Sequence, residues 1–120
     1  MFSVNRIIPI VKVSDIGRAV SFYCDRLGFV KISLFQRAPN HPGYATLEKD
    51  GCRLHVSSFP GDGTIGCCMY FEVRRIEDVR NELLSRGWTE DDVQIMNQDW
   101  GNREIYLSDN DQNSIRFGER

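Results

Sequence analysis

The chain has 120 residues and a formal net charge of −2, with 41% hydrophobic and 27% charged residues. This length is typical of one domain with one core, and the charge provides no basic field for nucleic acid. Apolar runs are too short to span a membrane, and the first residues, MFSVNRIIPIVKV, lack the basic start and cleavage site of a signal peptide. We therefore expect a cytoplasmic protein with no nucleic-acid or membrane partner. The four cysteines, Cys24, Cys52, Cys67 and Cys68, show no CxxC spacing, and we expect them to be reduced thiols.

The first half of the chain predicts a strand, a helix and three further strands. The β-branched run IIPIVKV at 7–13 predicts the first strand. SDIGRAVSFYCDRLG at 14–28 then places apolar residues on one helical face, with Asp15 as N-cap and Gly28 at the C-terminal end. Three strand-like runs follow at 29–36, 43–49 and 52–58.

The second half repeats this order. CCMYFEV at 67–73 predicts a strand, and RIEDVRNELLSRG at 75–87 predicts a helix. This helix should begin weakly, because Arg75 stands where an Asp or Ser cap is favoured. The remaining strands are predicted at 92–97, 102–108 and 113–118.

Matching positions in the two halves lie about 60 residues apart, as in the pairs Val13 and Val73, Gly28 and Gly87, and Leu54 and Ile115. The repeat predicts an α+β protein in which one domain, 1–120, is made of two βαβββ modules, about 1–60 and 61–120. A single module would leave its sheet half covered, so the two should pair, within the chain or across a dimer.

The predicted strands separate apolar from polar side chains. Leu54 and Val56 share one face of their strand, while Arg53 and His55 share the other. The apolar faces need the helices as a cover, which places the helices outside mixed sheets that curve around a cavity. Charged groups on the other faces cannot line a sealed core without a large desolvation cost. Those faces should meet water or a ligand.

Three segments together resemble the bleomycin-resistance branch of the glyoxalase / bleomycin resistance / dioxygenase (vicinal oxygen chelate) superfamily: IPIVKVSDIGRAVSFYCDRLGF, LHVSSFPGDG and WGNREIYLSDNDQNSIRFGE. The resemblance implies paired βαβββ modules and a homodimer that holds a drug in crevices between subunits without modifying it. We therefore expect a non-catalytic, cofactor-free protein that binds a bleomycin-like drug or another small aromatic or polar ligand, and the resemblance associates this class of protein with antibiotic resistance.

One hairpin departs from the family pattern. The family has Asp-Pro-x-Gly-Asn where this chain has Asp109-Asn110-Asp111-Gln112-Asn113. With the glycine gone, Gln112 or a neighbouring Asn should adopt a positive φ, or the turn should change type.

Two alternative functions remain: a dimeric scaffold with no small ligand, and a metal-dependent lyase, isomerase or dioxygenase. The resemblance implies that such enzymes draw their ligands from four strand positions, which here hold Ile8, His55, Cys68 and Arg116. Isoleucine cannot ligate and a guanidinium repels a cation. Two donors remain, one fewer than a catalytic zinc site usually draws from the protein. We therefore predict no metal.

The candidate ligand-binding residues are Trp100, His55, Arg116, Arg103, Phe35, Tyr44 and Phe59. The resemblance carries the family's drug-contacting tryptophan to Trp100, which otherwise would plug the end of a hairpin. His55 is a cavity-lining or a structural residue. Arg116 either pairs with Glu72 or binds an anionic or carbonyl group. Arg103 and Glu104 are expected to form a cross-strand or interface ion pair, and packing is the simpler role for the aromatic set Phe35, Tyr44 and Phe59.

Overall fold

The computed structural model describes residues 1–119, which form two four-stranded sheets. The first sheet has the order β1-β4-β3-β2 and contains β1 (Ile10–Lys12), β2 (Val30–Gln36), β3 (Gly43–Lys49) and β4 (Cys52–Ser57). The second has the order β5-β8-β7-β6 and contains β5 (Cys68–Val73), β6 (Met96–Asn97), β7 (Arg103–Ser108) and β8 (Ser114–Glu119). The β1–β4 and β5–β8 pairs are parallel and the others antiparallel. Two βαβββ modules in an α+β fold are thus confirmed.

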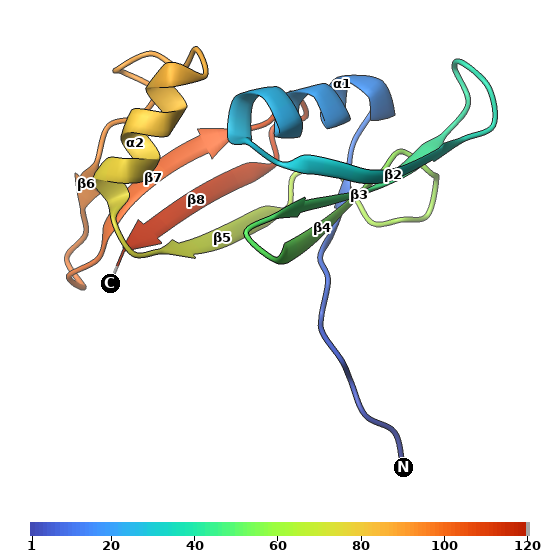
Figure 1. Ribbon diagram of the computed structural model, residues 1–120, viewed down its shortest axis with the longest axis horizontal. Helices are drawn as coiled ribbons and strands as arrows, with labels where there is room; N and C mark the ends of the chain where they lie inside the picture. Colours follow the sequence, from blue (N-terminus) through green and yellow to red (C-terminus); the bar gives the residue numbers. More distant parts are fainter. Residues whose placement is uncertain (120) are drawn as a thin grey trace.

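Both helical segments lie on the same side of the sheets (Figure 1). In the first module, α1 (Ile16–Ser21) continues into the π-helix η1 (Phe22–Arg26), and in the second, α2 spans Ile76–Ser85. The buried faces of the strands point toward these helices, so one face of each sheet is covered as predicted. Within residues 1–119, every helix is too short or too polar to cross a membrane.

The first helix is not the regular helix predicted over 14–28. Asp15 caps it as expected, with Oδ1 accepting from the Arg18 N–H at 2.9 Å. The π-helical turn then adds a residue per turn, so the neighbours Phe22 and Tyr23 are both buried. The two rings meet edge to face at 5.2 Å. A 3.6-residue period assigns only Tyr23 to the core, because it cannot anticipate this insertion.

Two strands are shorter than predicted. The run at 7–13 contributes only Ile10–Lys12, and the run at 92–97 only Met96–Asn97. Pro9 still accepts a hydrogen bond from the His55 N–H at 3.0 Å, but it has no N–H of its own to donate. The residues before it leave the sheet as an extended segment that runs away from the body (Figure 1) and is exposed except at the half-buried Ile8. We call residues 1–9 the N-terminal arm.

A buried hydrogen-bond network, which we call the module junction, connects the two halves of the chain. Tyr23 of the first module donates to Asp109 Oδ2 at 2.8 Å. The Asn113 side chain donates to the Lys12 carbonyl at 3.0 Å and to Asp109 Oδ2 at 2.8 Å. Its Oδ1 accepts from the backbone N–H groups just before β5, at 2.8 and 3.0 Å. The last hairpin therefore serves as the joint between the modules.

The turn of that hairpin confirms the expected strain. Gln112 has φ of 63°, in the left-handed region that favours glycine. Its N–H donates to the Asp109 carbonyl at 3.2 Å, and Asp109 Oδ1 accepts from the Asp111 and Asn113 N–H groups at 2.8 and 2.9 Å. The Asp side chain holds the turn closed although the glycine is absent.

A residue of β8 supplies the N-terminal cap that α2 lacks in its own sequence. Arg75 provides no side-chain cap, as predicted. Instead, Glu119 at the end of β8 places Oε2 2.9 Å from the Ile76 N–H, where it accepts the hydrogen bond of a cap. Glu119 Oε1 also binds Arg103 at 2.6 Å. The start of α2 is therefore held by a residue 43 positions away in sequence.

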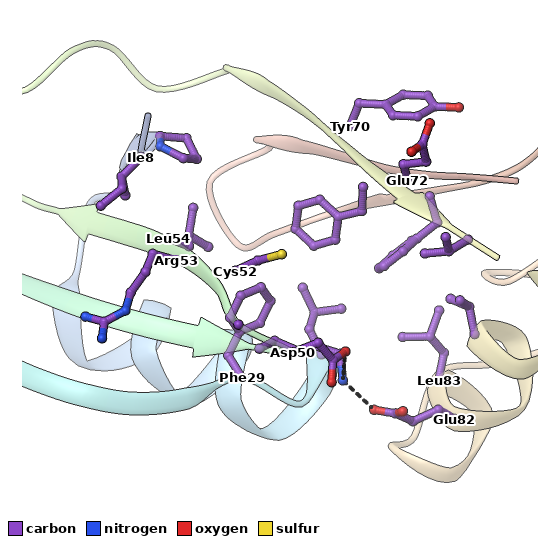
Figure 2. Close-up of a pocket in the computed structure, with 18 of the residues that line it drawn as sticks. Ile8, Phe29, Asp50, Cys52, Arg53, Leu54, Tyr70, Glu72, Glu82 and Leu83 are labelled. Atoms are coloured by element: carbon purple, nitrogen blue, oxygen red, sulfur yellow. Dashed lines mark hydrogen bonds and ion pairs between the residues drawn. The ribbon is translucent and has the colours of Figure 1, made fainter. Parts of the chain in front are cut away.

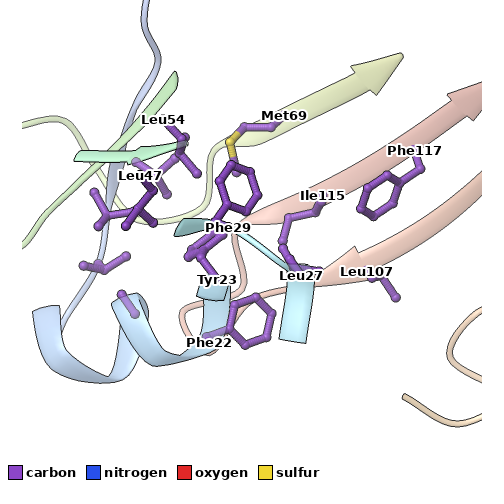
Figure 3. Close-up of a cluster of buried hydrophobic side chains, with 14 of the residues drawn as sticks. Phe22, Tyr23, Leu27, Phe29, Leu47, Leu54, Met69, Leu107, Ile115 and Phe117 are labelled. Atoms are coloured by element: carbon purple, nitrogen blue, oxygen red, sulfur yellow. The ribbon is translucent and has the colours of Figure 1, made fainter. Parts of the chain in front are cut away.

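The core lies between the helices and the sheets and draws on both modules (Figure 3). Phe29 of the first module meets Phe71 of the second at 6.0 Å between ring centroids. Phe71 also lies edge to face with Phe117 at 5.1 Å. Aromatic packing thus connects the two sheets on their helix-facing side.

Candidate functional site

The sheet faces that point away from the helices are the candidate binding surface, and we call them the open faces. Register places Tyr44 opposite Ser57, and Thr46 opposite His55, on one open face. In the second sheet it places Arg116 between Tyr70 and Tyr106. These faces carry the polar residues that the strand pattern assigned to water or a ligand.

The first open face gathers four of the predicted binding residues into what we call the aromatic row: Phe59, Phe35, Tyr44 and His55. Phe35 on β2 is paired with Tyr44 on β3. Its ring is stacked on Phe59, with centroids 6.2 Å apart and planes 16° apart. Tyr44 meets His55 edge to face at 5.2 Å. Phe35 is 56% exposed, so the row presents an accessible aromatic surface.

His55 is fixed by a short hydrogen bond within the row. Its Nδ1 lies 2.6 Å from the Tyr44 hydroxyl. Burial lowers the pKa of the His55 imidazole, and the nearby Arg53 guanidinium adds to this effect. Burial likewise raises the pKa of the Tyr44 phenol, with a further contribution from Asp62. Both groups are therefore neutral at pH 7.

Arg116 on the second open face is stacked on a tyrosine. Its guanidinium carbon lies 4.4 Å from the centre of the Tyr106 ring, within the range of a cation–π interaction. The Tyr106 hydroxyl donates to Glu104 at 2.9 Å and accepts from Gln98 at 3.1 Å. The hydrogen bond to Glu104 is the main reason that the pKa of Tyr106 is raised. This arrangement presents a flat cation on a fixed aromatic support.

Gly118 is a feature of this face that sequence reasoning missed. The Tyr70 side chain crosses directly over it, and a Cβ at Gly118 would lie 1.7 Å from the Tyr70 hydroxyl oxygen. That hydroxyl accepts from Asn102 at 3.1 Å. Any side chain at Gly118 would displace Tyr70. The sequence signal was a lone glycine in a strand, which marks close approach of another group.

Two predicted binding residues lie apart from these groups. Arg103 is not paired with Glu104 as expected: adjacent strand residues point to opposite faces, and Arg103 instead binds Glu77 of α2 at 2.5 Å and Glu119 at 2.6 Å. It therefore has a structural role on the helix side. Trp100, in the loop before β7, is 64% exposed and plugs no hairpin end within the described chain.

A cavity of about 710 Å³ lies elsewhere, between the two modules (Figure 2). Its walls include Phe29, Leu54 and Leu83, and the ion pair between Lys49 and Glu82, at 3.4 Å, stands at its edge. Among the residues that the structure describes, its lining contains none of the predicted binding residues. Sequence reasoning missed it because the same apolar side chains read as core.

A second cavity, of about 590 Å³, does contain one predicted residue. Arg116 and Tyr106 lie on one side of it, and Trp88, Asp91 and Asp92 of the loop after α2 contribute another. Asp92 is held by the Thr89 N–H, which donates to its carboxylate at 3.0 Å, and this hydrogen bond is the main cause of its lowered pKa. Cation and carboxylates share this polar cavity.

The metal-ligand positions do not form a metal site. Ile8 lies in the N-terminal arm and Arg116 is stacked on Tyr106. His55 has its Nδ1 engaged by Tyr44. Across residues 1–119, no group of three or more His, Cys, Asp or Glu side chains is placed to hold a metal ion. The four cysteines are free thiols.

Fold and sequence together define the class of protein. The family model described as "Glyoxalase superfamily protein" matches residues 1–120. The chain therefore belongs to the glyoxalase superfamily, as the sequence motifs predicted. Among curated proteins it is similar to the bleomycin resistance proteins of Geobacillus stearothermophilus and Staphylococcus aureus, at 25% identity over 130 residues and 92% of either chain.

Solved structures agree on the fold. A glyoxalase/bleomycin resistance protein/dioxygenase superfamily member from Sphaerobacter thermophilus is 27% identical, covers 98% of both chains and has a TM-score of 0.72. The bleomycin-binding protein of Streptomyces verticillus, in complex with copper(II)-bleomycin, is 21% identical with a TM-score of 0.75, over 100% of this chain and 99% of that chain. A glyoxalase-related enzyme from Clostridium phytofermentans has a TM-score of 0.76 at 20% identity, over 98% of this chain and 96% of that chain.

Proposed function

We propose that this protein is a cytoplasmic, non-catalytic binder of small planar ligands, of which a bleomycin-like drug is the first candidate. The observation that carries this proposal is the aromatic row, in which the exposed ring of Phe35 and the half-buried rings of Phe59 and Tyr44 lie beside the neutral, fixed imidazole of His55. Flat heteroaromatic groups stack well on such rings. The similarity to bleomycin resistance proteins points to the same class of ligand.

Thermal unfolding with added ligand tests this function. Metal-free bleomycin at 100 times its Kd should add roughly 2.7 kcal/mol to the free energy of unfolding. A panel of planar metabolites measured in parallel identifies other ligands. If bleomycin leaves the melting temperature unchanged at every concentration while another planar compound raises it, the bleomycin part of the proposal is wrong and the binding part stands. If neither bleomycin nor any compound on the panel binds, the proposal that the protein binds planar ligands is wrong.

A homodimer is the second part of the proposal, because much apolar surface is exposed on the open faces and the N-terminal arm. Ile10, Phe35, Tyr70 and Tyr106 are all at least 39% exposed on the open faces. The arm adds further exposed apolar side chains: Met1, Phe2, Val4 and Ile7. So many exposed apolar side chains on one protein favour an interface. A second copy would cover both and turn the open faces into the walls of a crevice.

Light scattering at micromolar concentration tests the dimer. The measured mass should be twice that of the chain, and deletion of residues 1–8 should shift the mass toward that of a monomer. A full-length chain that is monomeric under these conditions would rule out a crevice between subunits.

The metalloenzyme alternative requires donors that the described residues do not supply, since isoleucine and arginine occupy two of the four ligand positions. Elemental analysis of untagged protein tests it directly. We expect well below one Zn, Mn, Fe, Ni or Co per chain. A stoichiometric metal that is lost in His55→Leu would establish the alternative.

A further inference from the structure

The Tyr44–His55 pair leaves the imidazole one orientation. Tyr44 on β3 and His55 on β4 occupy diagonal positions of the same sheet face, where side chains of neighbouring strands can touch. The 2.6 Å contact uses His55 Nδ1. Because both residues are on strands, the register holds them rather than a loop. Nε2 is the ring nitrogen that remains for another molecule.

The proton positions follow from the neutrality of both groups. A neutral phenol carries one proton and a neutral imidazole carries one, so the short contact has the hydroxyl donating to Nδ1 and the ring proton on Nε2. The reverse arrangement would turn the phenol proton away from its nearest acceptor. The charged side chains of the neighbouring strands and loop are Lys12, Glu48, Arg53 and Asp62; of these, Arg53 is already paired with Glu48 at 2.7 Å.

We propose that Tyr44 fixes His55 as the Nε2–H tautomer, and that this N–H selects ligands with a carbonyl oxygen or an aromatic ring nitrogen at the edge of their planar group. The inference rests on the proposed function, because it assigns the planar group to Phe35 and Phe59. A planar ligand without such an acceptor would desolvate the N–H and leave it unpaired, which disfavours binding. His55 is therefore a specificity residue rather than a remnant of a metal site.

The first test needs no ligand. Nitrogen-15 NMR of histidine-labelled protein reports the protonation of each ring nitrogen. His41, which is exposed in the loop after β2, is the internal reference, and His41→Gln assigns its signals. We expect His55 to show a protonated Nε2 at pH 7, and Tyr44→Phe to move the Nδ1 signal to that of a nitrogen without a hydrogen-bond donor. A protonated Nδ1 in the wild type would overturn the inference.

The second test compares affinities for metal-free bleomycin. His55→Gln keeps an N–H donor near the position of Nε2, whereas His55→Leu removes it. The Leu variant should bind about tenfold more weakly, and the Gln variant should stay within about threefold of wild type. Melting temperatures of both variants identify any loss of folding. Equal affinity of wild type and the Leu variant, or equal loss in both variants, would overturn the inference.

The pH dependence of bleomycin affinity shows whether His55 Nε2 donates or accepts the hydrogen bond to the ligand. Nε2–H donates in both the neutral and the protonated imidazole, so the ratio of wild-type to His55→Gln affinity should hold between about pH 7.5 and about pH 5.5, on either side of the ordinary histidine pKa. The Gln variant corrects for titration of the drug. If Nε2 instead accepted a proton from the ligand, the ratio would fall about tenfold per pH unit below the His55 pKa. If neither bleomycin nor any compound of the planar panel binds the wild type, the proposed function and this inference are both overturned, whereas the outcomes above overturn the inference alone.

Discussion

The Tyr23 hydroxyl donates a hydrogen bond of 2.8 Å to Asp109 Oδ2, which joins the helix of one module to the last hairpin of the other. Tyr23 is fully buried, and burial together with the Asp109 carboxylate raises the pKa of its phenol. Asn113, also fully buried, completes the junction by binding the Lys12 carbonyl. The polar residues of this hairpin thus hold the modules in register.

Substitutions in the module junction should destabilise the protein, and the loss should be larger for a residue with more hydrogen-bond partners. Tyr23→Phe should lower the free energy of unfolding by about 1–2 kcal/mol, and Asn113→Ala by about 2–4 kcal/mol, because it leaves several buried groups unpaired. Urea unfolding measures both. Asn102→Ala, which removes an exposed Asn hydrogen bond to Tyr70, is the matched control and should change stability by less than about 0.5 kcal/mol. Equal effects of the two Asn variants would contradict a structural junction.

The cap of α2 should make stability depend on pH. The hydrogen bond from the Ile76 N–H, followed by Arg103, lowers the pKa of Glu119 in the folded protein. Its contribution is therefore complete above the unfolded pKa of about 4.3 and is lost as the pH falls through the lower, folded value. Glu119→Gln keeps the acceptor but removes the charge, so its melting temperature should be lower than that of wild type at pH 7 and the difference should close in acid.

A charge variant on an exposed loop is the control for this titration. Glu90→Gln affects only a 3.9 Å contact with Arg80 and should show no such convergence. Melting curves of Glu119→Gln that stay parallel to wild type across the whole acid range would show that the carboxylate charge does not hold α2.

Relieving the positive φ of the last turn should stabilise the protein. Gln112→Gly removes the steric cost of the left-handed conformation, and we expect a gain of about 0.5–1 kcal/mol, measured by urea unfolding. Asn110→Gly, in the same turn but without a positive φ, should be neutral or destabilising because glycine increases the entropy of the unfolded chain. A loss of stability in Gln112→Gly would show that the side chain contributes more than its backbone costs.

The fold was largely predictable because the repeat constrains it. The offset between Leu54 and Ile115 predicted that their strands are equivalent in the two modules. Side-chain alternation assigned His55 and Arg116 to the correct sheet faces. The missing glycine predicted a positive φ at Gln112 or a neighbouring Asn, or a change of turn type, and Gln112 is the residue that adopts it. What could not be predicted depends on contacts distant in sequence: the π-helical insertion that buries Phe22, and the Glu119 cap, which no local pattern announces.

The site was predicted less completely. Phe35, Tyr44 and Phe59 were named only as a set for which packing was the simpler role, and nothing local to β2, β3 and β4 indicates that Phe35 stacks on Phe59 or that Tyr44 binds His55. The expected pairing of Arg103 with Glu104 was wrong, and its partner Glu77 could not be anticipated because that residue lies on a helix whose docking angle the sequence does not specify. The cavity between the modules was missed for a similar reason, since it depends on how the two sheets are placed.

Replacement of the two tryptophans should have opposite effects: loss of Trp88 should lower stability, and loss of Trp100 should lower ligand affinity. Trp88 packs edge to face on Phe22 at 5.9 Å, donates to the Arg26 carbonyl at 2.8 Å and lies under the Arg26 guanidinium at 4.2 Å. Trp88→Ala should therefore cost about 3 kcal/mol of stability. Trp100→Ala should change stability by less than about 0.5 kcal/mol and weaken bleomycin binding by about 1–3 kcal/mol, the range for stacking on an aromatic side chain. A destabilised Trp100→Ala with unchanged affinity would make its indole structural.

Calorimetric titration of the wild-type protein with metal-free bleomycin tests the central claim, that the open faces bind a bleomycin-like planar ligand. The account predicts saturable binding with one site per chain and a negative heat-capacity change from burial of apolar surface. Phe35→Ala, which removes an exposed ring of the aromatic row, should weaken this binding without a loss of folding. Binding that is undiminished in Phe35→Ala, or no measurable heat with the wild type, would contradict it.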